Sequence, residues 1–142
     1  HPPEGYRTEN SNAYSTVLSI QYYDFSMLLT GDLEADGEAM VMEEFFKKQY
    51  AGNTTNQFTE YDLLKVAHHG SKNSTSEEFL SYVRPKVAVI SCGFGNSYGH
   101  PHPELLERLD EIGSNYFITY EKGAITICTD GERMVLNEYL DK

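Results

Sequence analysis

Two pairs of histidines are the residues in this chain most suited to chemistry. His68 and His69 directly follow an apolar run, while His100 and His102 flank Pro101 in a glycine-rich segment. Neutral imidazole is a common ligand for zinc and manganese, and it takes up and releases protons near neutral pH. Taken alone, the first pair is equally compatible with ordinary surface turn residues, and the second with a helix entry. Together the two pairs favour a metal or catalytic site.

Asp32 is the third candidate. It follows the apolar run 25–30, and Gly31 beside it lets another part of the backbone approach closely. A carboxylate fixed at such a place can bridge two divalent metal ions. The alternative is a cap for a helix that begins at Leu33. The two roles are compatible, because one carboxylate oxygen can cap while the other binds metal.

The elements that must position these residues can be predicted from periodicity. Apolar, β-branched and aromatic runs predict strands, and apolar residues at helical spacing predict helices. The predicted strands are 15–22, 25–30, 63–67, 87–92, 116–120, 124–128 and 133–139. One helix is predicted over 33–50, a second starts within 74–78 and ends at Pro85, and a third runs from Pro103 to Gly113. Each candidate residue therefore lies after a predicted strand.

The order of these elements, β-β-α-β-α-β-α-β-β-β, predicts a layered α/β fold with a mixed sheet. We expect a single partial domain over residues 1–142. Thr75 and Glu78 have the spacing of a capping box at the second helix. Residues 52–56 are predicted to form a polar loop.

Composition limits the classes of function. A formal net charge of −11 without a basic run argues against a general nucleic-acid clamp, unless metal ions reverse the local charge. The two cysteines, Cys92 and Cys128, lie in apolar segments and are predicted to be buried free thiols. The loop that begins at Gly93 lacks the lysine and spacing of a P-loop, and no nucleophile elbow is present.

Five segments in order resemble a known family. They are 10–18, 28–34, 64–71, 84–91 and 96–103, and they include Thr-Gly-Asp, His-His-Gly-Ser and Gly-His-Pro-His-Pro. Thr-Gly-Asp is common to many metallo-β-lactamase-fold proteins. The two histidine motifs are more specific, and with the other segments they resemble the carboxyl-terminal metallo-β-lactamase-like domain of ComEC competence proteins, the DNA-uptake channels of bacterial transformation.

The resemblance implies an αβ/βα sandwich with a one- or two-metal site on one edge. Asp32 then takes the position of the bridging metal ligand, and His68 takes that of the last metal ligand. His69, His100 and His102 are expected to line the site as catalytic groups that bind substrate or transfer protons.

The chain departs from the family pattern in its first ligand cluster. No His-x-His-x-Asp-His or His-x-Asp-x-Asp-His loop is present, because no histidine lies between His1 and His68. A histidine ligand that normally precedes Asp32 is also missing unless His1 serves. We therefore interpret the chain as roughly the second half of the domain, with zinc or manganese bound weakly or not at all. Ser71 and Asn12 are weaker site candidates.

Two functions follow as hypotheses. In the first, the intact protein is a metal-dependent hydrolase of phosphodiesters that acts on DNA during uptake, and this chain is a soluble domain of that bacterial plasma-membrane protein. In the second, the chain is a non-catalytic structural or partner-binding half-domain. The expected partners are DNA, the remainder of the parent chain, and a second copy that covers an exposed apolar face.

Overall fold

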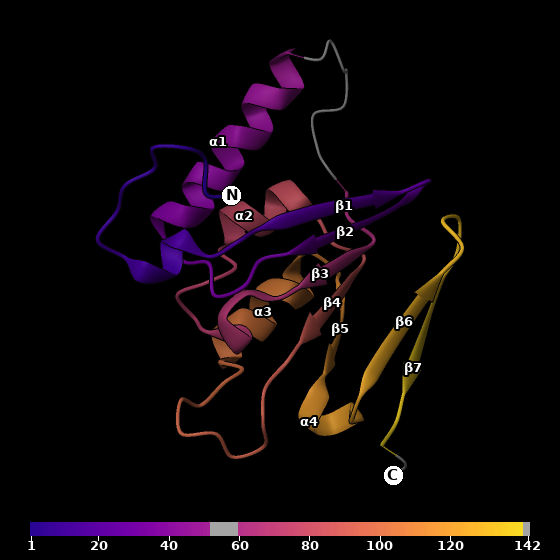
Figure 1. Cartoon of the computed structure of the whole chain (residues 1–142). Helices are drawn as coiled ribbons and strands as arrows, with labels where there is room; N and C mark the ends of the chain where they lie inside the picture. Colours follow the sequence, from indigo (N-terminus) through magenta and orange to yellow (C-terminus); the bar gives the residue numbers. More distant parts are fainter. Residues whose placement is uncertain (52–59, 141–142) are drawn as a thin grey trace.

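The computed structural model describes residues 1–51 and 60–140, and its centre is a five-stranded sheet (Figure 1). The strand order is β1-β2-β3-β4-β5, and the bounds are Leu18–Tyr22, Phe25–Leu29, Leu63–Lys65, Val87–Ile90 and Asn115–Ile118. A separate two-stranded sheet contains β6 (Ile125–Thr129) and β7 (Met134–Glu138). The helices are α1 (Asp36–Ala51), α2 (Glu77–Val83), α3 (Pro103–Glu111) and α4 (Thr119–Lys122), with 3-10 turns η1 (Ser11–Tyr14) and η2 (Ala67–Gly70).

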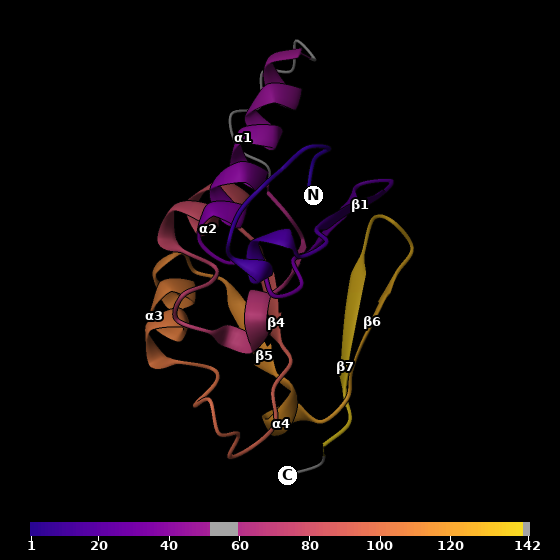
Figure 2. The ribbon, with the colours of Figure 1, turned by 60° about the vertical axis from the view of Figure 1, so that its left-hand side comes forward.

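The strand order places the three long connections on one side of the sheet. Strand β1 is antiparallel to β2, whereas β2, β3, β4 and β5 are mutually parallel. Each parallel step passes through one helix, and parallel crossovers are almost always right-handed. Successive steps in one direction therefore put α1, α2 and α3 on the same face. Figure 2 shows these helices on one side of the sheet and the β6–β7 hairpin on the other.

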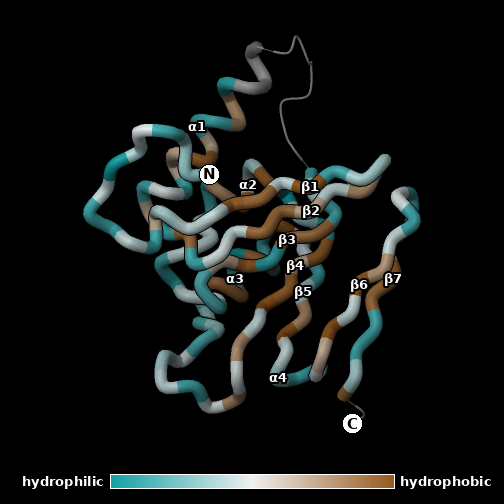
Figure 3. The backbone as a smooth tube through the Cα atoms, viewed as in Figure 1, coloured by the Kyte–Doolittle hydropathy of each residue, from teal (hydrophilic) through white to brown (hydrophobic). Residues whose placement is uncertain are grey.

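The hydrophobic core lies between the sheet and these helices. Residues at alternating strand positions point into it, as the alternating burial along β4 shows. From the strands it takes Leu28, Leu64, Ala88, Ile90 and Ile118, and from the helices Val41, Met42, Phe79, Leu80, Val83, Leu105 and Leu109. Figure 3 shows the hydrophobic residues concentrated in the central strands. This packing fixes the strand ends from which the site is built.

The opposite face of the sheet is only partly covered. Leu18, Ile20 and Tyr22 of β1 are exposed on it. The β6–β7 hairpin pairs only with itself, and its turn meets the β1–β2 turn where the Asp24 N–H donates to the Gly131 carbonyl at 2.9 Å. Within the described residues, no helix has the length and apolar character that a membrane crossing requires.

The predicted α/β class, mixed sheet and order of strands and major helices are confirmed. The strand predicted over 116–120 is wrong at its end, because β5 stops at Ile118 and α4 follows. Beyond Ile118, the Thr119 side chain replaces the backbone as the hydrogen-bonding partner of the segment after β4. The Thr119 hydroxyl accepts from the Cys92 N–H at 3.0 Å and donates to the Cys92 carbonyl at 2.9 Å. The polar loop predicted at 52–56 lies outside the described residues.

Three local predictions need correction. Helix α1 begins at Asp36 rather than Leu33, so Asp32 does not cap it. Helix α2 is capped by Ser76, whose hydroxyl accepts from the backbone of Phe79, because the Thr75 hydroxyl instead accepts from the Ala67 N–H. Both cysteines are free as predicted. Cys128, however, is exposed on the self-paired hairpin, and Cys92 is half-buried.

Candidate functional site

The turn after β3 holds both histidines of the first pair in a left-handed backbone conformation. His68 has φ 44° and ψ 46°, and His69 has φ 56° and ψ 17°. Such values are uncommon outside glycine and cost of order 1–3 kcal/mol each, so the surrounding structure must hold them. One restraint is the His68 N–H, which donates to the Gly31 carbonyl at 2.9 Å. This bond ties the His68 turn to the segment that carries Asp32.

Gly70 lets the second histidine segment approach the first. A Cβ atom at Gly70 would lie 2.6 Å from Cβ of Pro101 and 3.0 Å from a methyl carbon of Leu105. The residue also has a φ of +89°, which disfavours any side chain. Its carbonyl accepts from the His102 N–H at 2.9 Å. The glycine after the first pair is therefore what permits close packing against the second pair.

The four histidines form one cluster. The ring centroids of His68 and His100 lie 5.6 Å apart, those of His100 and His102 lie 4.9 Å apart, and those of His68 and His69 lie 6.4 Å apart. His68 and His69 follow β3, and His100 and His102 lie in the loop between β4 and α3, so the cluster lies at the carboxyl edge of the parallel strands. Ligand sites in open α/β sheets collect at this edge.

His68 is oriented by a half-buried carboxylate. Oε1 of Glu34 lies 2.7 Å from Nδ1 of His68, and the Glu34 side chain is 13% exposed. Nδ1 must donate to this carboxylate, so Nε2 of a neutral ring carries the lone pair. Glu34 also accepts from the Asn12 amide at 3.1 Å and from the Ser71 hydroxyl at 3.2 Å. Asn12 and Ser71 therefore act through Glu34.

These hydrogen bonds change the acidity of Glu34. Burial alone would raise the pKa of this carboxyl. The hydrogen bonds from Asn12, His68 and Ser71, together with the charge of His68, outweigh burial and lower the pKa below its ordinary value. Glu34 is thus held as a carboxylate beside the ring of His68.

His69 has its own orienting partner. Its Nδ1 lies 2.6 Å from the Ser91 carbonyl, which can only accept, so Nδ1 carries the proton. Nε2 of a neutral His69 ring is then an unprotonated base, and it lies 3.8 Å from Oδ1 of Asp32. Both side chains are about half exposed, at 52% and 50%. A proton taken up at Nε2 would face a carboxylate.

His102 has the opposite arrangement. Its Nδ1 accepts from the Lys72 backbone N–H at 3.3 Å, so the proton of a neutral ring resides on Nε2. The cluster therefore contains a lone pair on Nε2 of His69 and a donor on Nε2 of His102. The two rings differ because Nδ1 of His69 contacts a backbone carbonyl and Nδ1 of His102 contacts a backbone N–H, and neither backbone group titrates.

His100 lies between these groups. Burial, followed by the imidazoles of His102, His68 and His69, lowers the pKa of His100 below its usual value, and Glu34 acts in the opposite direction. Its backbone is fixed by the Asn96 side chain, which accepts from the His100 N–H at 3.0 Å and donates to the His100 carbonyl at 2.6 Å. Burial and the neighbouring imidazoles therefore favour the neutral form of the His100 ring.

Lys65 places a cation beside the cluster. It is half-buried at the end of β3, in register with Leu29 and Val89, and its ammonium donates to the Val66 carbonyl at 2.7 Å. None of the carboxylates in the described residues lies within 4.0 Å of it. Burial lowers its pKa, while the charge of Asp32 raises it.

The structure thus brings together the five residues predicted from the sequence: Asp32, His68, His69, His100 and His102. It pairs them differently from the predicted ligand set, because the carboxylate beside His68 is Glu34 and the imidazole beside Asp32 is His69. Sequence reasoning missed Glu34 and Lys65 as site residues. A signal for Glu34 was present, since Asp32 and Glu34 flank the fully buried Leu33.

The donor chemistry suits zinc or manganese, but the number of donors does not. The described part of the chain contains no group of three or more His, Cys, Asp or Glu side chains arranged to hold a metal ion. A protein metal site of this type needs at least three protein ligands. The residues present therefore do not form a complete metal site, and the roles of Asp32 and His68 as ligands stay predictions.

Comparison with known proteins gives three informative relatives. The chain is 39% identical over 123 residues to ComE operon protein 3 of Bacillus subtilis, and 35% identical over 136 residues to Recombination protein 2 of Haemophilus influenzae. It is 33% identical over 123 residues to Competence protein ComA of Neisseria gonorrhoeae. These alignments cover 87%, 96% and 87% of the chain, but only 14%, 16% and 16% of the relatives. No family model and no solved structure matches the chain.

Proposed function

Because the chain belongs to the ComEC-related competence proteins and corresponds to one segment of them, we propose that it supplies the histidine cluster of a phosphodiester-hydrolysing site that acts on DNA during uptake. The observation that carries the proposal is the pair of opposite hydrogen-bonding patterns at His69 and His102. The unprotonated Nε2 of His69 can act as a base, and the Nε2–H of His102 in the same cluster can donate a hydrogen bond to developing negative charge, and hydrolysis of an ester uses both.

The proposed reaction uses these two rings in turn. Nε2 of His69 accepts a proton from water as the water oxygen forms a bond to phosphorus. The bond from phosphorus to the leaving oxygen breaks as Nε2–H of His102 donates a hydrogen bond to that oxygen, which then takes a proton from solvent. Asp32, 3.8 Å from Nε2 of His69, stabilises the imidazolium formed in the first step. His69 then releases its proton to solvent, and His102 keeps its own proton throughout.

The remaining groups of the site orient the histidine rings or bind the phosphate. Glu34 holds the ring of His68, and His100 packs against it, with ring centroids 5.6 Å apart. Lys65 offers an ammonium that has no carboxylate partner among the described residues, which suits one phosphate oxygen. A local cation of this kind reduces the repulsion between a chain of net charge −11 and a DNA backbone.

A zinc or manganese ion enters the proposal only as an ion shared with ligands outside this chain. Asp32 and the lone pair on Nε2 of His69 are the two groups in position to contribute, and His68 offers a further lone pair on Nε2. Because the described residues do not complete such a site, no step above depends on a metal.

We also propose that the fold is half of a metallo-β-lactamase-like αβ/βα sandwich. Helices cover one face of the sheet only, and the other face carries the exposed residues Leu18, Ile20 and Tyr22 beside the β6–β7 hairpin. In the intact plasma-membrane protein, the remainder of the parent chain would cover this face. A second copy would do so if the chain were alone.

The proposal is tested on the intact protein with a fluorescent DNA oligonucleotide. His69→Asn and His102→Gln should each lower the hydrolysis rate by about 100-fold, as expected for loss of a general base or of a hydrogen-bond donor to developing charge. Asp32→Ala should lower it as well and should weaken any binding of manganese or zinc measured by calorimetry. Glu43→Gln on the exposed side of α1 is the control and should hydrolyse at the original rate. Full hydrolysis by both histidine variants would refute the proposal.

The second candidate function is a non-catalytic structural or partner-binding half-domain. It is favoured by one observation, the lack of a three-ligand group among the described residues. On this alternative, the intact protein shows no hydrolysis that depends on His69 or His102, whichever divalent ion is supplied. The oligonucleotide assay therefore separates the two functions.

A further inference from the structure

Two aromatic side chains on the loop that carries His100 and His102 are exposed to solvent. Phe94 is 88% exposed and Tyr98 is 76% exposed, in the loop between β4 and α3. This loop also supplies His100 and His102. Single exposed apolar residues are common on protein surfaces. Two highly exposed aromatic rings on one short loop that also carries candidate site residues need an explanation.

The loop is held in shape by a single side chain. The Asn96 amide donates to the Gly93 carbonyl at 2.9 Å and to the His100 carbonyl at 2.6 Å. Its oxygen accepts from the backbone N–H groups of Tyr98 at 3.2 Å and His100 at 3.0 Å. The two aromatic residues therefore extend from a backbone that is fixed on both sides of Asn96.

Tyr98 extends the histidine cluster outward. Its ring stacks on His100 with a centroid separation of 5.7 Å and an interplanar angle of 25°, and His100 in turn lies 5.6 Å from His68. The high exposure of Tyr98 leaves its other ring face in water. Phe94 makes an edge contact with Tyr120 at 5.9 Å and 66°, which fixes its position without covering it.

We propose that Tyr98, stacked on His100 of the histidine cluster, and Phe94, exposed on the same loop, form a stacking subsite for the unpaired bases of single-stranded DNA. This inference rests on the proposed function for the nature of the ligand. A base in a duplex has both faces covered by its neighbours, so only an unpaired base offers a face to an aromatic ring. The subsite would thus select single strands over duplexes at the point of hydrolysis.

The charge of the chain strengthens the argument for stacking. At a net charge of −11, the surface cannot hold a strand mainly through its phosphates. Contact with ring faces needs no positive charge and tolerates every base sequence. The proposal therefore predicts binding with a shallow salt dependence, in contrast to the steep dependence of basic nucleic-acid proteins.

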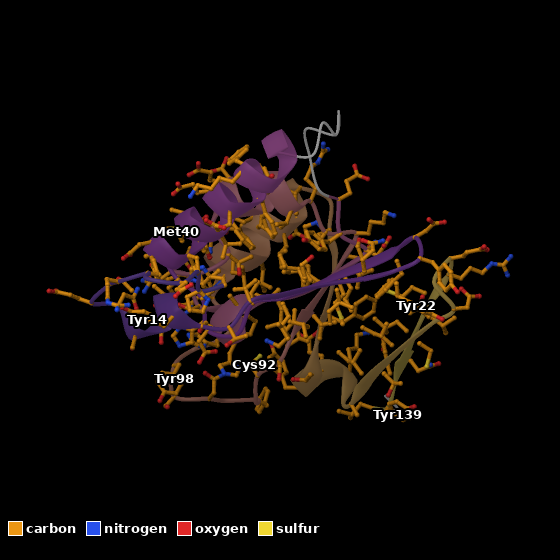
Figure 4. All side chains as sticks on the ribbon, turned by 45° about the horizontal axis from the view of Figure 1, so that its top comes forward. Tyr14, Tyr22, Met40, Cys92, Tyr98 and Tyr139 are labelled. Atoms are coloured by element: carbon orange, nitrogen blue, oxygen red, sulfur yellow. The ribbon has the colours of Figure 1, made fainter. Side chains whose placement is uncertain are left out.

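The test uses the 142-residue chain and a fluorescent oligothymidylate measured by anisotropy. Tyr98→Leu and Phe94→Leu should each weaken binding by about tenfold, whereas Tyr98→Phe should keep it. The matched control is Tyr139→Leu, because Tyr139 is 63% exposed and lies at the far side of the molecule from Tyr98 (Figure 4). An abasic strand of equal length should bind the original chain as weakly as oligothymidylate binds Tyr98→Leu.

A second variant reports contact directly. The chain has no tryptophan, so Tyr98→Trp introduces a single tryptophan whose fluorescence a stacked base should quench. Absence of binding, equal binding of the abasic strand, or unchanged affinity in both leucine variants would overturn the subsite. The subsite and the proposed function can fail independently. If oligothymidylate binding depends on Tyr98 but the intact protein shows no histidine-dependent hydrolysis, the subsite is supported and the proposed hydrolase activity is refuted.

Discussion

Oε1 of Glu34 and Nδ1 of His68 are 2.7 Å apart, and this contact determines which nitrogen of His68 is free. The carboxylate comes from the segment just before α1, and the imidazole comes from the turn after β3. A carboxylate behind a histidine ring is the usual way in which proteins fix such a ring for chemistry. Glu34 is therefore the residue that positions His68 within the histidine cluster.

We predict that Glu34→Gln lowers DNA hydrolysis by the intact protein about 10- to 100-fold, the usual effect of losing an orienting carboxylate. The amide keeps the shape of the side chain but removes the charge and one acceptor. The measurement is the rate under saturating substrate, with Glu43→Gln as the control. An unchanged rate would mean that His68 needs no orientation.

The lowered pKa of Glu34 has a consequence for stability against pH. A carboxyl with a depressed pKa stabilises the fold above its unfolded value of 4.5, and this contribution is lost as the pH falls through the folded pKa. The difference in unfolding free energy between the original chain and Glu34→Gln should therefore shrink in acid. Urea unfolding at several pH values between neutral and acid measures it.

Gly70→Ala should destabilise the fold by roughly 1–3 kcal/mol, because the added methyl group overlaps Pro101 and the backbone has a positive φ. Gly99→Ala is the matched control, since Gly99 has a φ of +73° but open space around its Cα. The difference between the two variants in urea unfolding isolates the overlap with Pro101. Equal losses would show that the close approach has no energetic role.

Glu38 is a carboxylate buried under the turn that follows the first histidine pair. It is 3% exposed and accepts from the backbone N–H groups of Thr75 and Ser76. Glu38→Gln should cost roughly 1–3 kcal/mol in unfolding free energy, because its amide nitrogen cannot accept and one N–H loses its partner. Glu78→Gln, on the exposed side of α2, should be neutral within error.

Lys65→Met should separate stability from function. Methionine removes a half-buried charge, and the unfolding free energy should rise by about 1 kcal/mol. Because burial lowers the pKa of Lys65, the gain should shrink as the pH rises through that pKa and the original lysine loses its proton. Hydrolysis by the intact protein should fall. A variant that is both less stable and fully active would contradict both roles.

His100 should titrate below its usual pKa of 6.5 in an NMR titration of the ring protons. His102→Asn removes one neighbouring imidazole and should move the His100 pKa upward, although burial should keep it below 6.5. Tyr139→Leu should leave the titration curve unchanged. A His100 pKa above 6.5 in the original chain would contradict the arrangement of the cluster.

Much of the fold follows from periodicity, because apolar runs and helical spacing report burial directly. The strand ends carrying Asp32 and His68 are predictable for this reason. Glu34 and Lys65 are not, since their roles depend on contacts made by the folded chain. Local sequence also misled at Thr75, because the choice of cap depends on a bond to Ala67, eight residues earlier.

The left-handed backbone at His68 and His69 bears on how a substrate would be received. Both rings owe their directions to the folded chain and to partners such as Glu34 and the Ser91 carbonyl, all of which are in place before any ligand arrives. The histidine cluster is thus preorganised, and substrate binding should require no remodelling of this turn. Asparagine and glycine, which tolerate such torsion angles, are the replacements that would delete an imidazole while leaving its scaffold intact.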